Sequence, residues 1–184
     1  MNKFISIATA VFTIAAAAVL LPIEASAASA STSLNFNNIG SYAYYHLKCS
    51  ALVLSGTNAI NLQVSEDNGV TYKASNYKWD LKYTNTGSAS MTITNNTSDV
   101  GMRVGGGGTS APGTSIDVTF NNLTSSLVTK PALFVQDQYD GTDYYSANGV
   151  GVYTGDTGAI NALRIIPGSG TITTGQCSLY GYGS

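Results

Sequence analysis

The C-terminal stretch GAINALRIIPGSGTITTGQCSLYGYGS (158–184) carries the pattern that decides the fold class. Residues 159–166 are mostly apolar and β-branched, and residues 171–182 alternate between apolar and polar types. The turn-forming run Pro167-Gly168-Ser169-Gly170 separates them, which predicts two strands joined as a tight hairpin. We therefore expect the chain to end inside a β-sheet and not in a tail.

The same strand-and-turn pattern continues upstream through most of the chain. Asn68-Gly69, within residues 66–69, predicts a hairpin turn because both residue types accept the positive φ that tight hairpins need. The glycine-rich residues 105–113 are expected to form a flexible loop inside the domain. Turn signals recur at intervals of roughly ten residues, a pattern typical of an antiparallel sandwich or barrel. Further strands are expected near residues 45–51, 62–64, 77–83, 90–94, 101–104, 115–120, 132–136 and 144–153.

The N-terminus has the organisation of a secretory signal peptide. Lys3 precedes an apolar run over residues 4–21, Pro22 breaks the helix, and Ala25-Ser26-Ala27 provides small residues at cleavage spacing. We expect an N-terminal hydrophobic helix, cleavage after Ala27 and a secreted protein. The alternative is a membrane anchor, because the run approaches the roughly 20 residues that span a bilayer. Contact with a membrane is expected only if residues 4–23 are retained.

Removal of residues 1–27 leaves a chain of roughly 160 residues, which suits one domain with a sizeable core. We expect an N-terminal arm over residues 28–39 and a single β-sandwich over residues 40–184. The arm ends in alternating Leu34 and Phe36, so it could add a strand to the open edge of a neighbouring subunit. The alternative is a disordered tail that leads into the first strand.

Charge limits the classes of partner. The net charge is −2, only 10% of residues are charged, and no basic patch is visible. Nucleic acid and anionic membrane surfaces are therefore not expected as partners. A surface rich in Ser, Thr, Asn, Tyr and Gly suits an extracellular β-protein.

Two cysteines lie near the two ends of the expected domain. Cys49 shares a strand face with Leu47, and Cys177 shares one with Leu179, so both are expected to point inward. Because the first and last strands of many sandwiches are neighbours, a Cys49–Cys177 disulfide is plausible in an oxidising compartment. Two buried free thiols are the alternative.

Two parts of the chain resemble a module of bacteriophage virion proteins. They are residues 63–72 with 75–79, QVSEDNGVTY and SNYKW, and the closing strand AINALRII at 159–166 with Gly168 to Gly170, Ile172, Gly175 and residues 179–181. Such modules occur in tail-fibre, receptor-binding and capsid-decorating proteins. The resemblance implies a jelly-roll-like sandwich that is often oligomeric and has no enzymatic activity. If the protein is carried by a phage, it implies a place on the virion surface.

We expect neither catalysis nor a cofactor. The chain has one histidine, His46, on the polar face of its strand, and no Gly-x-Ser-x-Gly motif that would position a nucleophile. One histidine and two distant cysteines do not supply the usual ligands of a zinc site. Gly105 to Gly108 lack the following Lys and helix of a phosphate-binding loop.

One loop combines acidic and aromatic side chains. It could hold a glycan against its tyrosine rings, or bind calcium through Asp137, Asp140 and Asp143, although the spacing is not that of an EF-hand. The plain alternative is a hairpin tip in which Asp and Gly only make the turn. The candidate ligand residues are Asp137, Tyr139, Asp140, Asp143, Tyr144 and Tyr145.

Trp79 alternates with Leu81 and Tyr83, which favours a core position over a platform for sugars. Three functions remain. The first is a structural or adhesive subunit that assembles with copies of itself and presents loops to a host surface, receptor or glycan. The second is a secreted, monomeric carbohydrate-binding module, and the third is a small hydrolase that uses Asp137, Asp140 or Asp143.

Overall fold

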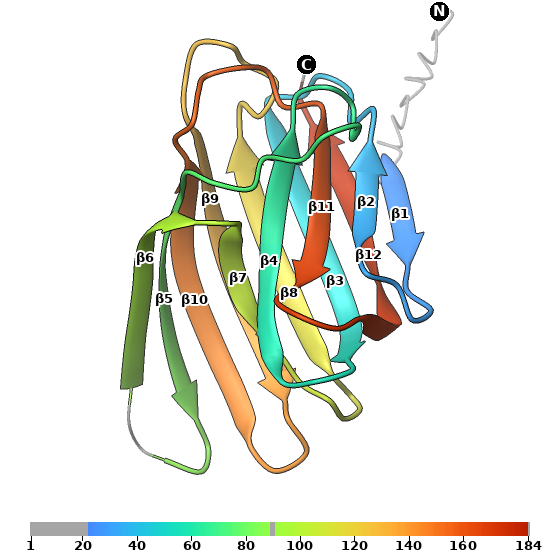
Figure 1. The fold of residues 1–184 in the computed structure, drawn as a ribbon, viewed down its shortest axis with the longest axis vertical. Coiled ribbons are helices and arrows are strands. Elements are labelled where there is room, and N and C mark those ends of the chain that lie inside the picture. Colours follow the sequence, from blue (N-terminus) through green and yellow to red (C-terminus); the bar gives the residue numbers. More distant parts are fainter. Residues whose placement is uncertain (1–21, 89–90, 184) are drawn as a thin grey trace, which may run out of the picture.

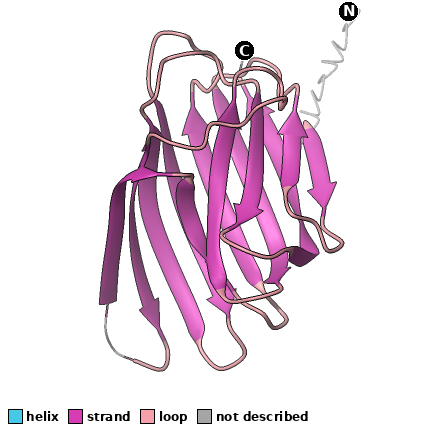
Figure 2. Ribbon diagram, viewed as in Figure 1, coloured by secondary structure: helices cyan, strands magenta, loops and turns pink. Residues whose placement is uncertain are grey.

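A computed structural model of the protein describes residues 22–88 and 91–183 (Figures 1 and 2). These residues form strands and connecting loops, and they contain no helix long and apolar enough to cross a membrane. The expected N-terminal hydrophobic helix lies outside the described residues. The strands are β1 (Glu24–Ala27), β2 (Leu34–Asn37), β3 (Tyr44–Leu54), β4 (Asn58–Ser65), β5 (Tyr77–Asn85), β6 (Met91–Asp99), β7 (Met102–Gly107), β8 (Thr114–Asn121), β9 (Lys130–Tyr139), β10 (Tyr144–Tyr153), β11 (Ala162–Pro167) and β12 (Ile172–Tyr182).

The strands form two antiparallel sheets, so the expectation of an all-β, sandwich-like fold is confirmed. The large sheet has the order β1-β12-β3-β8-β9-β10-β5-β6, and the small sheet has the order β2-β11-β4-β7. In Figure 1 the small sheet lies in front of the large one. Because four strands cannot cover eight, part of the inner face of the large sheet extends beyond the small sheet.

Alternation along each strand builds the core between the sheets. In β8, Ile116, Val118 and Phe120 are buried, whereas Ser115 and Thr119 face solvent. This is the period of two that places alternate side chains on opposite faces of a strand. The small sheet contributes its own apolar residues to the same core: Leu34, Phe36, Ile60, Leu62, Val64, Val104, Leu163 and Ile165.

The core position expected for Trp79 is confirmed, because only 8% of its surface is exposed. Its indole nitrogen donates a hydrogen bond of 3.1 Å to Asp99 Oδ2. Leu81, two residues further along β5, is also buried, while Lys78 and Lys82 point to the opposite face.

The expected C-terminal hairpin is wrong. β11 pairs with β2 and β4 in the small sheet, whereas β12 pairs with β1 and β3 in the large sheet. Pro167 to Gly170 do form a connection, but it carries the chain from one sheet to the other. Local alternation predicted both strands without specifying their partners, because any strand with one apolar face can pack in either sheet.

The turn at residues 66–69 also has the predicted local geometry but joins strands that do not pair. Asn68 and Gly69 have φ values of 62° and 85°, the positive φ that the Asn-Gly pair predicted. The turn nevertheless connects β4 of the small sheet to β5 of the large one, so it is not a hairpin.

The expectation of a flexible loop at residues 105–113 is wrong for its first part, because β7 continues to Gly107. The glycines allow this strand to press against the large sheet. A methyl group on Gly105 would come within 2.3 Å of Gln136 Oε1, and one on Gly107 within 2.1 Å of Leu54 Cδ1. Glycine is therefore needed here because β7 lies close to side chains of the large sheet, and not because the segment is flexible.

The N-terminal residues that the structure describes are part of the two sheets. β1 contains the expected cleavage site and pairs with β12, with Ala27 opposite Gln176. The segment expected as an arm, residues 28–39, contributes β2 to the small sheet of its own chain. Leu34 and Phe36 are buried there, at 1% and 0% exposure.

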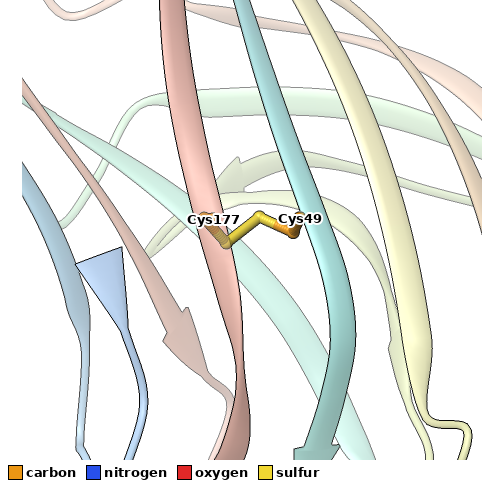
Figure 3. The surroundings of a disulfide bond; sticks show 2 residues. All are labelled: Cys49 and Cys177. Carbon is orange, nitrogen blue, oxygen red and sulfur yellow. A yellow bond between two sulfur atoms is a disulfide. The ribbon is translucent and has the colours of Figure 1, made fainter. Parts of the chain in front are cut away.

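The Cys49–Cys177 disulfide is present (Figure 3). The two cysteines are directly opposite each other in the β3–β12 pair, and both are buried, as the inward-facing pattern predicted. The bond joins residues 128 positions apart in the sequence. It links the last strand to the first long strand of the large sheet.

Candidate functional site

The candidate ligand loop forms the tip of the β9–β10 hairpin. Asp140 Oδ1 accepts hydrogen bonds of 2.9 Å from the backbone amides of Thr142 and Asp143. The hydroxyl of Tyr139 donates one of 2.9 Å to the carbonyl of Gly141. The amides of Asp143 and Thr142, with the Tyr145 hydroxyl, lower the pKa of Asp140, so this carboxylate is ionised at neutral pH and stabilises the turn.

The structure divides the six predicted loop residues between two sides of the hairpin. Asp137 and Tyr144 lie on the outer face of the large sheet, where the Tyr144 ring lies 4.8 Å from the ring of Tyr139. Asp143 lies against the backbone of Gly87 in the β5–β6 connection. Asp137, Asp140 and Asp143 do not converge, and residues 22–88 and 91–183 contain no group of three or more His, Cys, Asp or Glu that could hold a metal ion.

Two of the six residues, Asp140 and Tyr145, line a cleft on the inner side of the hairpin. The cleft lies where the inner face of β5, β9 and β10 extends beyond the edge of the small sheet, and its volume is about 270 Å³. Its polar lining comes from Asn58, Arg103, Gln136, Gln138 and Asp140, and its aromatic lining from Tyr83 and Tyr145. We call it the inter-sheet cleft.

Backbone contacts of β7 fix the polar floor of the inter-sheet cleft. Gln136 Oε1 accepts a hydrogen bond from the amide of Gly106, and Gln136 Nε2 donates one to the Gly106 carbonyl, both at 2.9 Å. The same nitrogen donates to Gln138 Oε1 at 3.0 Å. Gln138 thus lies at the cleft with its carbonyl oxygen already held, which orients its amide group before any ligand arrives.

Arg103 supplies a donor that has no partner within the described chain. Its guanidinium carbon lies 5.8 Å from the centre of the Trp79 ring, a cation–π arrangement. Its Nε is buried and makes no hydrogen bond. A buried donor without an acceptor costs about 1–3 kcal/mol.

Little in the sequence pattern indicated this cleft. Most of its lining comes from β4, β5, β7, β9 and β10, and the sequence pattern predicts only a strand that ends at Gln136. The one available signal was a pair of long amides at inward positions of an otherwise apolar strand, because buried amides require partners.

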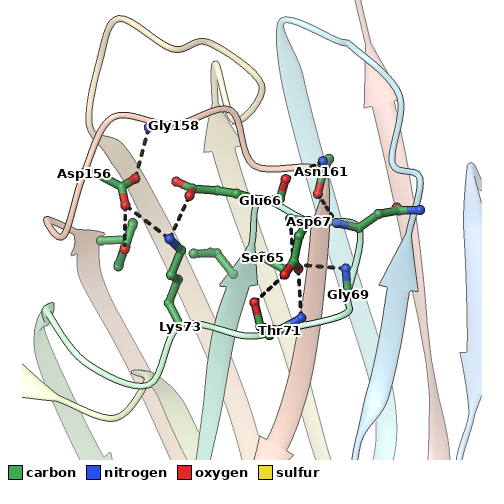
Figure 4. Close-up of polar contacts among 12 residues, drawn as sticks. Ser65, Glu66, Asp67, Gly69, Thr71, Lys73, Asp156, Gly158 and Asn161 are labelled. Carbon is green, nitrogen blue, oxygen red and sulfur yellow. Dashed lines mark hydrogen bonds and ion pairs between the residues drawn. The ribbon is translucent and has the colours of Figure 1, made fainter.

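A second polar cluster joins the β4–β5 and β10–β11 connections (Figure 4). Lys73 Nζ lies 2.7 Å from Glu66 Oε2 and 3.2 Å from Asp156 Oδ2. The Tyr153 hydroxyl also donates to Asp156 Oδ2, at 3.2 Å. Sequence reasoning missed this cluster, because Lys73 and Asp156 are 83 positions apart.

The two carboxyl groups of the cluster respond oppositely to their proximity. The neighbouring Asp156 carboxyl and burial raise the pKa of Glu66. The Glu66 carboxyl, the amide of Gly158 and Lys73 lower the pKa of Asp156 to about 2. The two acids and Lys73 therefore form a clamp between two connections at the same end of the sandwich, and Glu66 is the acid that takes up a proton first.

Replacement of Lys73 by methionine is expected to destabilise the fold at neutral pH by about 1 kcal/mol, since it leaves two partly exposed carboxylates facing each other. A raised folded-state pKa favours folding below the unfolded pKa and loses that contribution as pH rises through the folded value. The deficit should therefore shrink as pH falls and Glu66 is protonated. Urea unfolding at pH 7 and pH 4.5 measures it.

Lys48→Met is the matched control for that experiment. Lys48 is 57% exposed and lies 3.7 Å from Asp117, so its loss should change stability by no more than about 0.5 kcal/mol at either pH. Equal effects of the two substitutions, or a Lys73→Met deficit that does not depend on pH, would contradict the clamp.

Asp67 stabilises the turn beside this cluster (Figure 4). Its Oδ1 accepts hydrogen bonds from the Ser65 hydroxyl at 2.7 Å and from the Thr71 amide at 2.8 Å, and its Oδ2 contacts the Thr71 hydroxyl. The bonds from Thr71 and Ser65 lower the pKa of Asp67 to about 2. Ser65, Asp67 and Thr71 therefore stabilise the turn itself.

His46 lies on the outer face of the large sheet, as its strand position predicted. It contacts Asp117 Oδ1 and is 22% exposed, and its ring lies 6.4 Å from the ring of Tyr180. These are contacts of a half-exposed strand residue with its cross-strand neighbours.

Comparison of the chain with protein-family models, with curated proteins and with solved structures finds no match in any of the three. The class that the fold defines is an all-β, two-sheet domain with a disulfide between its first long strand and its last strand.

Proposed function

We propose that this protein is an exported, non-enzymatic adhesive subunit that binds a carbohydrate in the inter-sheet cleft. The observation that carries the proposal is the lining of this cleft, in which the Arg103 side chain and oriented amides lie beside two tyrosine rings. Sugars offer vicinal hydroxyls to planar polar groups and an apolar ring face to aromatic side chains. A few placed polar groups within an otherwise apolar recess are typical of small-molecule sites.

The size of the cleft limits the ligand. Its volume of about 270 Å³ is near the lower end of the roughly 300–1,000 Å³ of small-molecule pockets. We therefore propose that one sugar ring enters the cleft and that the rest of a glycan remains outside it. Asp140 would accept hydrogen bonds from the sugar, since its lowered pKa keeps it ionised.

The biological setting is part of the same proposal. We propose export through residues 1–27, a jelly-roll-like connection of the two sheets, and display on a surface, of the kind that virion surface modules represent. The buried disulfide supports a compartment in which such bonds form. The host-surface glycan or receptor is the expected partner, with no cofactor.

Arg103→Met tests the proposal. A glycan array followed by calorimetric titration of the best ligand should show binding to the wild type. The variant should bind at least tenfold more weakly, because a hydrogen bond from a charged donor contributes about 1.5–3 kcal/mol. No sugar binding by the wild type, or unchanged binding by Arg103→Met, would reject the cleft as a carbohydrate-binding site.

Arg164→Met is the matched control. Arg164 also lies over an aromatic ring, with its guanidinium carbon 4.2 Å from the centre of the Tyr72 ring, but its Nε already donates to Gln63 Oε1 at 2.7 Å. It lies outside the lining of the cleft. Its substitution should leave glycan affinity within about twofold of the wild type.

A further inference from the structure

The outer face of the large sheet carries an apolar strip at its centre. Leu133 and Val135 of β9 and Val150 of β10 are 60%, 53% and 51% exposed. They line a shallow depression of about 470 Å³ on the side of the sheet away from the core. Adjacent exposed apolar side chains in the middle of a sheet mark a surface suited to a partner.

Charged residues flank this strip in a regular order. The pairing registers place four outward-facing residues in one row across β8, β9, β10 and β5: Asp117, Val135, Asn148 and Lys82. The row begins with an anion and ends with a cation, and the strip lies between them.

The neighbouring row has a neutral residue at its β8 end and an acidic residue at its β5 end. It consists of Thr119, Leu133, Val150 and Asp80. Beyond Asp117, the same face continues to Lys48 on β3. Each flank of the strip thus carries both signs of charge, Lys48 with Asp117 on one side and Lys82 with Asp80 on the other.

We propose that two copies of this chain pair face to face through this outer surface, about a two-fold axis that runs along the strands between β9 and β10. Such an axis reverses the order of the strands in the second copy. Each residue keeps its height along the strand direction. Asp117 of one copy then faces Lys82 of the other, twice per dimer, and Leu133 faces Val150. The interface is isologous, because each copy uses the same patch.

A second copy is the occupant that the charge order favours. A row with opposite charges at its two ends becomes complementary to itself after this rotation, whereas a uniformly charged partner would meet a repelling charge on each flank of the strip. Five strands about 4.8 Å apart and about 30 Å long cover roughly 700 Å². That is close to the ~800 Å² per partner of a stable interface.

The pairing goes beyond the proposed glycan binding and does not depend on it. The inter-sheet cleft lies on the opposite side of the large sheet, so a face-to-face dimer leaves both clefts open. A dimer would present two cleft sites at once, which increases avidity for a surface with many glycans.

Charge exchange tests the proposal. Sedimentation equilibrium should show a dimer for the wild type. Lys82→Glu and Asp117→Lys each place like charges opposite one another twice per dimer, so each should raise the dimer dissociation constant at least tenfold. The double variant K82E/D117K restores opposite charges and should return the constant to within about threefold of the wild type.

Several outcomes would overturn the pairing: a wild type that stays monomeric at about 100 µM, single variants that dimerise normally, or a double variant that does not recover. Recovery in the double variant cannot come from general damage to the fold. Glycan titration of the same variants separates the two proposals, because loss of the dimer should leave the intrinsic affinity of each cleft unchanged.

Discussion

Replacement of both Cys49 and Cys177 by alanine is expected to lower the free energy of unfolding by about 2–5 kcal/mol, the usual cost of losing a native disulfide. The bond closes a loop with a sequence separation of 128, and its loss frees the unfolded chain to adopt many more arrangements. The native state loses little by comparison, because the two alanines still lie on the inner face of the sheet beside the buried Leu47–Leu179 pair.

Urea unfolding monitored by the fluorescence of Trp79 measures this loss. Wild-type protein unfolded in the presence of a thiol reductant should behave like the double variant, and the reductant should not affect the variant itself. A difference below about 1 kcal/mol between oxidised wild type and variant would mean that the disulfide does not determine the size of the unfolded ensemble.

Gly149→Ala is expected to cost about 2–3 kcal/mol, because the new methyl group has no space. It would lie 2.2 Å from the carbonyl oxygen of Asp80 and 2.4 Å from Cε2 of Phe134. The carbonyl belongs to the neighbouring strand β5, which pairs with β10 along its whole length. Relief of the clash therefore requires displacement of backbone in the middle of the large sheet.

Gly168→Ala is the control for the same chemical change in open space. The nearest atom to its methyl group would be the Ala59 carbonyl oxygen at 3.5 Å, an ordinary contact. The control should be neutral or slightly stabilising, since alanine restricts the unfolded chain. Similar unfolding midpoints for the two variants in urea would refute the steric explanation.

The sequence predicted the elements of this fold better than their connections. Alternation located the long strands and gave the inward direction of Trp79, Cys49 and Cys177, because the side-chain period of a strand is local. It did not predict which strands pair. Among the twelve described strands, only β5–β6, β8–β9 and β9–β10 are consecutive strands that pair, and every other connection carries the chain from one sheet to the other.

The glycine run shows a further limit of local reasoning. The glycines around Gly105 and Gly107 predicted a loop, because glycine is common in loops. Their role depends on Gln136 and Leu54, which approach them from other strands. No local pattern contains that information, and the same holds for the Glu66–Lys73–Asp156 clamp.

The candidate site was predicted in part. Asp140 and Tyr145 line the inter-sheet cleft. The Tyr139 hydroxyl and Asp140 Oδ1, however, already make hydrogen bonds within the turn. Arg103 could not be assigned, because the feature that distinguishes it, a buried Nε without an acceptor, exists only after the sheets have packed.

Strand β1 places the Ala25-Ser26-Ala27 motif at the edge of the large sheet, paired with residues 176–178 of β12. A peptidase needs its substrate as an extended, unpaired segment, so cutting after Ala27 and docking of β1 are mutually exclusive at any one moment. For the cleavage that we propose, the order of cutting and docking therefore selects between two products. If the cut comes first, the chain folds with the β12 edge uncovered and open to another strand; if docking comes first, the sheet itself protects the site from processing.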